Sequence, residues 1–420
     1  MMLLIKGGRV VDPASGRDEV GDIFIADGKI SAKKEKADQT IDANGLVVAP
    51  GLIDLSARLR EPGYEYKATL ESEMDAAVAG GVTSLACPPD TDPPLDEPAL
   101  VDMLRRRAKA FARARVYPVG ALTVKLAGER LTEMAQLAEA GCVAFSQANS
   151  PIADTQVLWR AMQYAATFGF PVWLRAEDRS LAHGGVAHDG EVATRLGLAG
   201  IPPFAETIAL GTLLELVRAT GVRLHVCRLS TAAGVEMIRA AKKEGLPVSC
   251  DVGIHYVHLS EMDLGHFDAH CRLEPPLRSQ RDREALASGL ADATIDCAVS
   301  DHTPVDENQK QLPFAEAEPG ATGLELLLPL VLKWGAAKKL PLAKMLARVT
   351  SDPARILGVP SGRIEDGALA DLVVFDPAQR WRVVPAALKS QGKNTPFLGY
   401  ELAGRVRTTI FAGKLVYERP

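Results

Sequence analysis

Hydrophobic and polar positions alternate in short runs at both ends of the chain. The first 50 residues contain strand-like segments such as LLIKGGRVVD and DIFIADGKIS, separated by Gly and Asp turns. Alternation with this punctuation is typical of β-hairpins. The pattern returns near the other end, where FAGKLVYE (411–418) repeats the apolar–Gly–basic–apolar order of IKGGRVVD (5–12). We therefore expect residues 1–50 and 358–420 to form one small composite β domain, a β-sandwich built by both termini.

In residues 51–357 the pattern changes, because apolar strand-like runs alternate with longer helical stretches. This alternation is typical of βα units around a parallel sheet. Eight such units predict a (β/α)8 barrel. A doubly wound sheet is the alternative, but no G-x-G-x-x-G follows a strand. The eight candidate strands are residues 51–59, 82–89, 115–123, 142–146, 171–178, 222–230, 247–257 and 294–304.

Composition and charge narrow the class of protein. The chain has 420 residues, a net charge of -5 and 47% hydrophobic residues, which is enough to build a large core. This balance gives no basic surface for nucleic acid, no apolar run is long enough for a bilayer, and the start lacks a signal-peptide pattern. We expect a cytoplasmic protein with no nucleic-acid or membrane partner. The cysteines are scattered singly without a C-x-x-C pair, which predicts buried, reduced thiols.

Candidate chemistry is sought where barrel active sites form, at the carboxyl ends of the strands. The polar residues expected there come from separate strands and include several arginines but few metal-binding side chains. They are Ser56, Arg58, Arg60, Gln147, Arg175, Arg228, His255, Asp301 and His302.

A family resemblance runs through nearly the whole chain. The segments PGLIDLSARLREPG, CPPDTDPPLDEP, AFSQANSPI, RAEDRSL, HVCRLSTAAGVEMIRAAKKEGLPVSCDV, EPPLRS, SDHTP and TSDPARILGVPSGRIEDGALADLVVFDP appear in the order in which dihydroorotases carry related motifs. The chain therefore resembles the dihydroorotases of the cyclic amidohydrolase superfamily. The resemblance implies a metal-bearing barrel and a small β domain made from both termini.

The chain departs from the family at the positions of the metal ligands. The resemblance places a His-x-His pair on strand one, an Asp on strand four and one His each on strands five and six. Only the strand-eight carboxylate, Asp301, is retained. The other positions, which we call degenerate metal positions, are Ser56, Arg58, Gln147, Arg175 and Arg228.

Substrate positions implied by the resemblance have also changed. The family's carboxylate-binding arginine is kept as Arg60, whereas Asp90 and Glu274 stand where the family has asparagines. Val305 replaces the histidine that follows the strand-eight motif.

Arginine at a ligand position changes the chemistry of the site. A guanidinium has five donors, no acceptor, and does not deprotonate in proteins, whereas zinc needs three or four N, S or O ligands. We therefore expect that zinc is lost and that no other cofactor replaces it. We also expect Asp301 to pair with Arg58, Arg175 or Arg228, so that no residue of the site is catalytic.

The resemblance and the altered site together predict a noncatalytic dihydroorotase homologue. Chains of this kind are structural partners of aspartate transcarbamoylase in pyrimidine biosynthesis, so we expect its catalytic chains as partners and also a homo-oligomer. One alternative is a divergent, active cyclic amidohydrolase that uses Asp301, His255 or His302. A second is an anion-binding sensor module built on Arg58, Arg60, Arg175 and Arg228. The run DENQKQ after Val305 is either a lid or a solvated loop.

Overall fold

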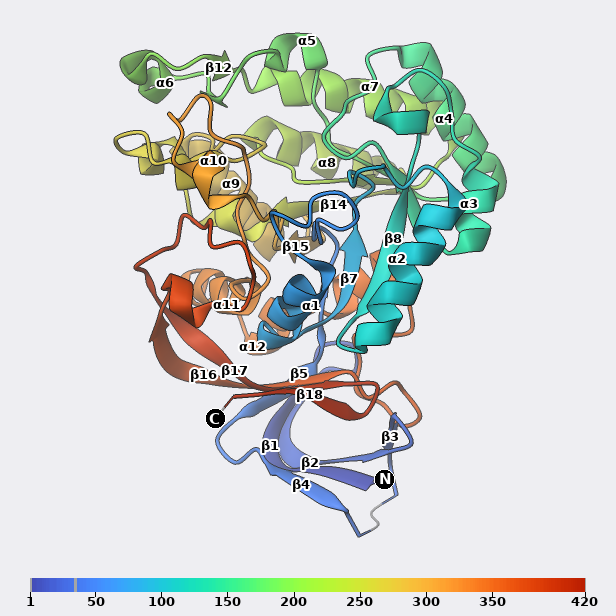
Figure 1. Ribbon diagram of the computed structural model, residues 1–420, viewed down its shortest axis with the longest axis vertical. Coiled ribbons are helices and arrows are strands. Elements are labelled where there is room, and N and C mark those ends of the chain that lie inside the picture. Colours follow the sequence, from blue (N-terminus) through green and yellow to red (C-terminus); the bar gives the residue numbers. More distant parts are fainter. Residues whose placement is uncertain (1, 34–35, 420) are drawn as a thin grey trace.

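The computed structural model describes residues 2–33 and 36–419. Its centre is a parallel sheet whose strands follow one another in sequence order, with helices packed around the outside (Figure 1). The strands of this sheet are β6 (Leu52–Asp54), β7 (Val82–Cys87), β8 (Arg115–Ala121), β9 (Ala144–Ser146), β10 (Val172–Leu174), β13 (Leu224–Val226), β14 (Val248–Gly253) and β15 (Cys297–Val299).

The sheet closes between its first and last strands. Ala57 and His302 form a parallel bridge just beyond β6 and β15. On either side of it, the Arg58 N–H donates to the His302 carbonyl at 2.9 Å and the His302 N–H donates to the Ser56 carbonyl at 3.1 Å. The predicted (β/α)8 barrel is therefore confirmed. Because β6 and β15 adjoin, residues far apart in sequence, such as Arg58 and Asp301, meet at one mouth.

Helices follow most strands of the barrel, and capping residues stabilise their ends. In α1, Thr69 and Ser72 form a capping box, and Gly80 caps the C-terminal end of the helix. The helices are α1 (Leu70–Ala79), α2 (Pro98–Phe111), α3 (Met134–Ala140), α4 (Thr155–Phe168), α5 (Arg179–Ala182), α6 (Glu191–Leu196), α7 (Phe204–Thr220), α8 (Ala232–Glu244), α9 (Gln280–Ala291), α10 (Glu307–Lys310), α11 (Leu327–Ala337), α12 (Leu342–Ala347) and α13 (Ser351–Leu357).

Both ends of the chain contribute to one mixed sheet at the base of the molecule. The blue N-terminal and red C-terminal ribbons lie together there (Figure 1). At their junction β5 is antiparallel to β16, with Val48 opposite Val374, and parallel to β1. The strands are β1 (Met2–Asp12), β2 (Arg17–Ala26), β3 (Lys29–Ser31), β4 (Gln39–Asp42), β5 (Val47–Pro50), β16 (Leu372–Arg382), β17 (Glu401–Phe411) and β18 (Lys414–Glu418).

Separate hydrophobic clusters hold these two parts. One fills the barrel interior and includes Ile53, Val119 and Trp173. Another lies on the terminal sheet and includes Ile5 and Ile25. The expected β-rich unit from both termini is therefore present, with a core of its own.

Two local features differ from, or add to, the expectations from sequence. The seventh barrel strand ends at Gly253, and the next residues form a 3-10 helix, Ile254–Val257, so His255 lies on a helical turn and not on a strand. A short parallel pair, β11 (Ala187–His188) with β12 (Gly200–Ile201), lies in the loop after β10. Further 3-10 helices are Val124–Leu126, Glu261–Leu264, Ala269–Cys271 and Pro385–Ala387.

The cysteines and the helices agree with the bulk properties of the sequence. All six cysteines are free, and five of them are buried, as the sequence predicts. Over the described ranges, no helix has both the length and the apolar character needed to cross a membrane.

Candidate functional site

The predicted site residues meet at the carboxyl ends of the barrel strands. Most of their side chains are buried, and Arg58 and Arg228 are each only 4% exposed, whereas Asp90 and Glu274 are partly exposed. The residues gathered at or just above the barrel mouth are Ser56, Arg58, Arg60, Asp90, Gln147, Arg175, Arg228, Glu274 and Asp301.

Arg58, which follows the first barrel strand, spans the mouth. Its Nε donates to Asp90 at 2.7 Å, and its Nη1 donates to Asp301 at 3.4 Å and to the Thr303 hydroxyl at 3.1 Å. Its Nη2 reaches the side-chain oxygen of Asn149 at 3.2 Å. Every nitrogen of this guanidinium therefore has an acceptor supplied by the chain.

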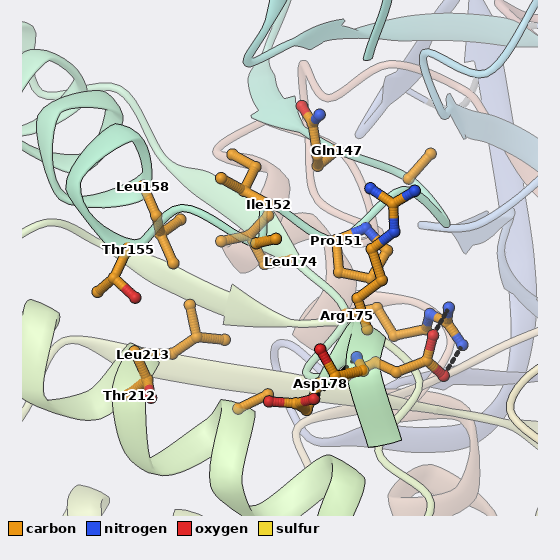
Figure 2. A pocket seen from close by; sticks show the side chains of 16 residues that line it. Gln147, Pro151, Ile152, Thr155, Leu158, Leu174, Arg175, Asp178, Thr212 and Leu213 are labelled. Carbon is orange, nitrogen blue, oxygen red and sulfur yellow. Dashed lines mark hydrogen bonds and ion pairs between the residues drawn. The ribbon is translucent and has the colours of Figure 1, made fainter. Parts of the chain in front are cut away.

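Arg175 is paired even more tightly. Its two terminal nitrogens donate to the two oxygens of Glu177 at 2.8 and 2.6 Å, which is a bidentate contact, and Nη2 also donates to Glu274 at 2.7 Å. Arg175 and Gln147 lie on the wall of a cavity of about 130 Å³ between α4 and α7, whose lining also includes Leu158 and Leu213 (Figure 2). Asp301 is not among the hydrogen-bond partners of Arg175.

Arg228 completes the cluster from the sixth strand. Its Nη1 donates to Asp301 at 3.4 Å and to the Glu274 carbonyl at 3.2 Å, and its Nη2 donates to Asn149 at 2.5 Å. The expected pairing of Asp301 is thus observed with Arg58 and Arg228. Each of them reaches the same oxygen, Oδ1, so neither contact is bidentate.

Asn149 is a residue that sequence reasoning missed. It follows β9, and its side-chain oxygen accepts from both Arg58 and Arg228 while its amide nitrogen donates to Glu274 at 3.2 Å. A neutral amide therefore ties together two arginines and one carboxylate. Its place two residues beyond Gln147, at the same strand end, was the signal available in the sequence.

Ser56 and Gln147 contact the cluster differently. The Ser56 hydroxyl donates to Asp301 at 3.3 Å. The Gln147 amide donates to the Thr123 hydroxyl at 2.7 Å, and its oxygen has no hydrogen-bond partner among the described residues. Gln147 thus lies at the mouth without joining the arginine–carboxylate network.

Arg60 stands at the edge of the same cluster. Its Nε donates to the Pro304 carbonyl at 2.8 Å, and Nη2 lies 3.6 Å from Glu318. Burial, and then the charge of Arg58, lower the pKa of Arg60, while Asp90 opposes that change. The arginine that the resemblance assigns to a substrate carboxylate is therefore already engaged with the chain.

The arginines and carboxylates of the mouth neutralise one another. Burial alone raises the pKa of Asp90 and Glu274, but the neighbouring arginines outweigh it and hold both pKa values below their usual range. Burial likewise lowers the pKa of Arg228, but Asp301, together with smaller contributions that include Glu274, outweighs burial and raises it above its usual value. The charges of the cluster and its edge balance, with five cationic side chains and five carboxylates. They are Arg58, Arg60, Lys67, Arg175 and Arg228, and Asp90, Glu177, Glu274, Asp301 and Glu318.

The two histidines considered from the sequence take different positions. His255 is buried near Asp301 and Arg228, and burial lowers its pKa to about 4, which makes it neutral at pH 7. His302 is fully buried. Its Nε2 lies 2.6 Å from Glu73, and its Nδ1 accepts the Gly323 N–H at 3.1 Å. Since Nδ1 accepts, Nε2 donates to Glu73, and His302 supports the packing below the mouth.

A zinc ion of the kind that the resemblance implies does not fit this donor set. At the positions that the resemblance assigns to metal ligands, the potential donors are the Ser56 hydroxyl, the Asp301 carboxylate and the Gln147 oxygen, and Asp301 already faces two guanidinium groups. The other carboxylates of the mouth, Asp90, Glu177 and Glu274, are each paired with an arginine. The space bounded by Ser56, Arg58, Arg175 and Arg228 is about 20 Å³, which is room for about one water molecule. Three fixed positive charges occupy the place where a dication would bind.

A second group of metal-binding side chains lies deeper in the barrel. Ligand atoms of His225, Cys227 and Asp251 lie within 4.8 Å of one another. However, both ring nitrogens of His225 already have partners, with Nδ1 at 2.8 Å from Ser249 and Nε2 at 2.9 Å from Asp251. Burial, which comes first among its causes, raises the pKa of the Cys227 thiol well above its usual value. These contacts fit a hydrogen-bonded interior better than a metal centre.

Among solved structures, this chain resembles hydantoinases. The chain superimposes on an L-hydantoinase (dihydropyrimidinase) from Arthrobacter aurescens with a TM-score of 0.88 and 26% sequence identity, covering 99% of this chain and 96% of that one. The barrel and the terminal sheet are therefore those of the amidohydrolase class.

The sequence comparisons narrow the class to a family. Residues 45–233 match the family model described as Dihydro-orotase-like. A "Dihydroorotase-like protein" of Pseudomonas aeruginosa is 45% identical over 100% of both chains. A "Dihydroorotase" of Geobacter sp. strain M21 is 40% identical, also over 100% of both. The chain belongs to the dihydroorotase-like family.

Proposed function

We propose that this protein is a noncatalytic member of its family, whose mouth is closed by ion pairs instead of holding a metal. The proposal is carried by one observation, the compensation between two sets of substitutions. Arg58, at a degenerate metal position, pairs with Asp90, and Arg175 pairs with Glu274. According to the resemblance, Asp90 and Glu274 replace neutral asparagines of the substrate site. Two of the three new positive charges therefore have a new negative charge beside them, and the third, Arg228, pairs with the retained Asp301.

This compensation removes both requirements of hydrolysis at the mouth. Without a bound metal, no water has its pKa brought to about 7 and no carbonyl is polarised. Asp301 faces Arg58 and Arg228, so its charge is engaged in holding the cluster together. A proton transfer by one carboxylate contributes about 10²–10⁴-fold, far below the acceleration that enzymes reach.

The first test is the metal content of the protein. Elemental analysis after purification without a chelator should find no stoichiometric zinc. The protein should neither hydrolyse dihydroorotate nor form it from carbamoyl aspartate. About one tightly held zinc per chain at the mouth would contradict the proposal and favour the divergent hydrolase.

A restored variant sharpens the same test. Changing Ser56, Arg58, Arg175 and Arg228 to histidine and Gln147 to aspartate supplies the donors that the mouth lacks. We expect this variant to take up metal without full turnover, because Asp90, Glu274 and Val305 still differ from the family's substrate positions. Failure of a folded variant to bind metal would show that the ligand positions were assigned wrongly.

We further propose that the protein acts as an assembly subunit of aspartate transcarbamoylase. The supporting argument is that the barrel is complete and well packed although its mouth is closed. Its outer surfaces are then the part of the molecule available for function. Obligate interfaces typically bury more than about 2,000 Å², so the complex should survive dilution. Co-expression followed by size exclusion with light scattering should give one large species. Separate elution at micromolar concentration, with the transcarbamoylase fully active alone, would contradict this role.

The anion-sensor alternative is weakened by the same charge balance, since each arginine already has a carboxylate of the chain as its partner. Thermal denaturation with carbamoyl aspartate, dihydroorotate, orotate or nucleotides distinguishes it. If the protein were such a sensor, its ligand at 100 times its Kd would add about 2.7 kcal/mol to the free energy of unfolding. We expect that none of these compounds raises the melting temperature.

A further inference from the structure

A second cationic region lies beside α10, in the run DENQKQ that follows the eighth strand. The run is neither a bare loop nor wholly solvated, because α10 spans Glu307–Lys310 and Lys310 is only 8% exposed. Lys310 lines a cavity of about 400 Å³ whose walls include the apolar side chains of Val305, Pro385 and Leu398.

The lysines of this cavity differ in their partners. Lys67 is held by Glu318 at 2.6 Å, and Glu318 also lies 3.6 Å from Arg60 of the mouth. In contrast, Lys310 donates only to the backbone carbonyls of Ala269, at 3.0 Å, and Arg272, at 3.2 Å. Lys393 likewise donates only to backbone carbonyls, at Leu388 and Ser390. Neither Lys310 nor Lys393 forms an ion pair within the described ranges.

The two carbonyl contacts of Lys310 would use both donors of a neutral amine but only two of the three donors of an ammonium. A neutral amine has two N–H donors and one lone pair, whereas an ammonium has three donors. Two carbonyl acceptors satisfy the neutral form completely and leave its lone pair free. Burial, and then the charge of Arg272, lower the pKa of Lys310 to about 7. A lysine that is desolvated and lies beside another cation is a recognised form of activated amine nucleophile.

Other charged groups around the amine act in both directions. Glu318, Cys271 and Asp268 raise its pKa, but by less than burial and Arg272 lower it. The remaining titratable groups that line the cavity are Lys67, His270, Asp306, Glu307 and Lys393.

We propose that Lys310 is a reactive amine that forms an imine with a small oxo acid entering this cavity. The amine lone pair attacks the carbonyl carbon, the amine gives up both protons, and the carbonyl oxygen leaves as water, so one C=N bond replaces one C=O bond. Lys393, which has no carboxylate partner, supplies the charge that recognises the acid group. The cavity adjoins the arginine cluster through Glu318, but none of the residues at the metal positions lines it, and the proposal does not depend on the proposed assembly role.

The test uses the whole wild-type protein with glyoxylate as the probe. Sodium cyanoborohydride traps the imine as a stable secondary amine, and peptide mass spectrometry measures the modification of each lysine. At pH 7 an ordinary lysine with a pKa of about 10.4 is neutral in only about one molecule in 2,500. Lys310 should therefore react at least about tenfold faster than the exposed Lys243 of α8, which serves as the internal control.

The pH profile and two variants decide between outcomes. The rate at Lys310 should level off above about pH 7, while the rate at Lys243 keeps rising. Lys310→Arg should remove the adduct, and Lys393→Gln should slow glyoxylate but not the neutral aldehyde acetaldehyde. Modification of Lys310 no faster than Lys243 in the wild-type protein would overturn the proposal, whatever the variants do. Equal rates with acetaldehyde and glyoxylate would overturn the assignment to an oxo acid.

Discussion

The barrel mouth and the cavity beside α10 are both lined by cationic side chains, yet they differ in how those charges are paired. At the mouth, the guanidinium groups of Arg58, Arg175 and Arg228 face carboxylates of the chain, and the space between them is about 20 Å³. Beside α10, Lys310 and Lys393 face only backbone carbonyls, and the cavity measures about 400 Å³.

The number of positive charges therefore does not by itself define a binding site. A buried ion pair with satisfied hydrogen bonds has little left to offer a ligand, because an incoming anion would have to displace a carboxylate already in place. A buried amine without a counter-ion stays costly until it is deprotonated or meets one. The more arginine-rich region is thus the closed one, and the region with fewer cations is the open one.

The largest expected effect comes from unbalancing the mouth. Asp301→Ala should lower the free energy of unfolding by about 3–5 kcal/mol, because it leaves Arg58 and Arg228 with one carboxylate fewer in a buried setting. Denaturant unfolding at pH 7.5 measures this. Asp75→Ala removes an exposed carboxylate paired with Arg113 and serves as the matched control, with an expected loss below about 1 kcal/mol. Equal, small losses in both variants would show that the mouth is not an electrostatically closed unit.

Acidification should have an effect that is next in size for each single histidine. Burial lowers the pKa of His255 and of His258 to about 4, so between pH 6.5 and 4 the unfolded chain binds more protons than the folded one. Their contribution is complete above pH 6.5 and is lost as the pH falls to 4, by about 3 kcal/mol for each histidine. Urea unfolding across this window checks the loss. His255→Gln should lose correspondingly less on acidification, and a slope identical to that of the wild type would contradict the assignment.

A smaller effect tests the amide that joins the arginines. Asn149→Ala should lower the free energy of unfolding by about 2 kcal/mol, since the hydrogen bonds that Arg58 and Arg228 donate to Asn149 lose their acceptor. Gln163→Ala is the control, because Gln163 accepts from the exposed Arg160 and should cost little. If both variants are equally stable, Asn149 contributes nothing beyond an exposed contact.

The sequence predicted the barrel well because period and order are properties of the chain itself. Strand-like runs separated by helical stretches placed the eight strands, and the closure between β6 and β15 followed from the fold. The extent of the seventh strand was not predictable, since residues 254–257 are as apolar as the strand they follow. Only the backbone distinguishes a strand there from the 3-10 turn that carries His255.

The sequence predicted which residues lie at the mouth better than it predicted which residues each of them contacts. The order of the strands predicts that Arg58, Arg175 and Arg228 meet at one mouth. It does not predict which carboxylate each of them contacts. Arg175 turns to Glu177 and Glu274 and not to Asp301, because side-chain direction depends on the loop after each strand. Asn149 and Lys310 were missed for the same reason. The place of Asn149 at the strand end was visible in the sequence, but its partners were not, and a lysine in a polar run carries no sequence signal of burial.

The smallest expected effect concerns the open region and completes the comparison. Lys310→Met should change the free energy of unfolding at pH 7.5 by about 1 kcal/mol or less. The variant loses two hydrogen bonds to carbonyls, each worth about 1 kcal/mol, but it no longer buries an amine that can be charged. Denaturant unfolding alongside Asp301→Ala tests this directly. A loss as large as that of Asp301→Ala would mean that Lys310 is an indispensable structural cation, which is the opposite of an amine held neutral and free to react.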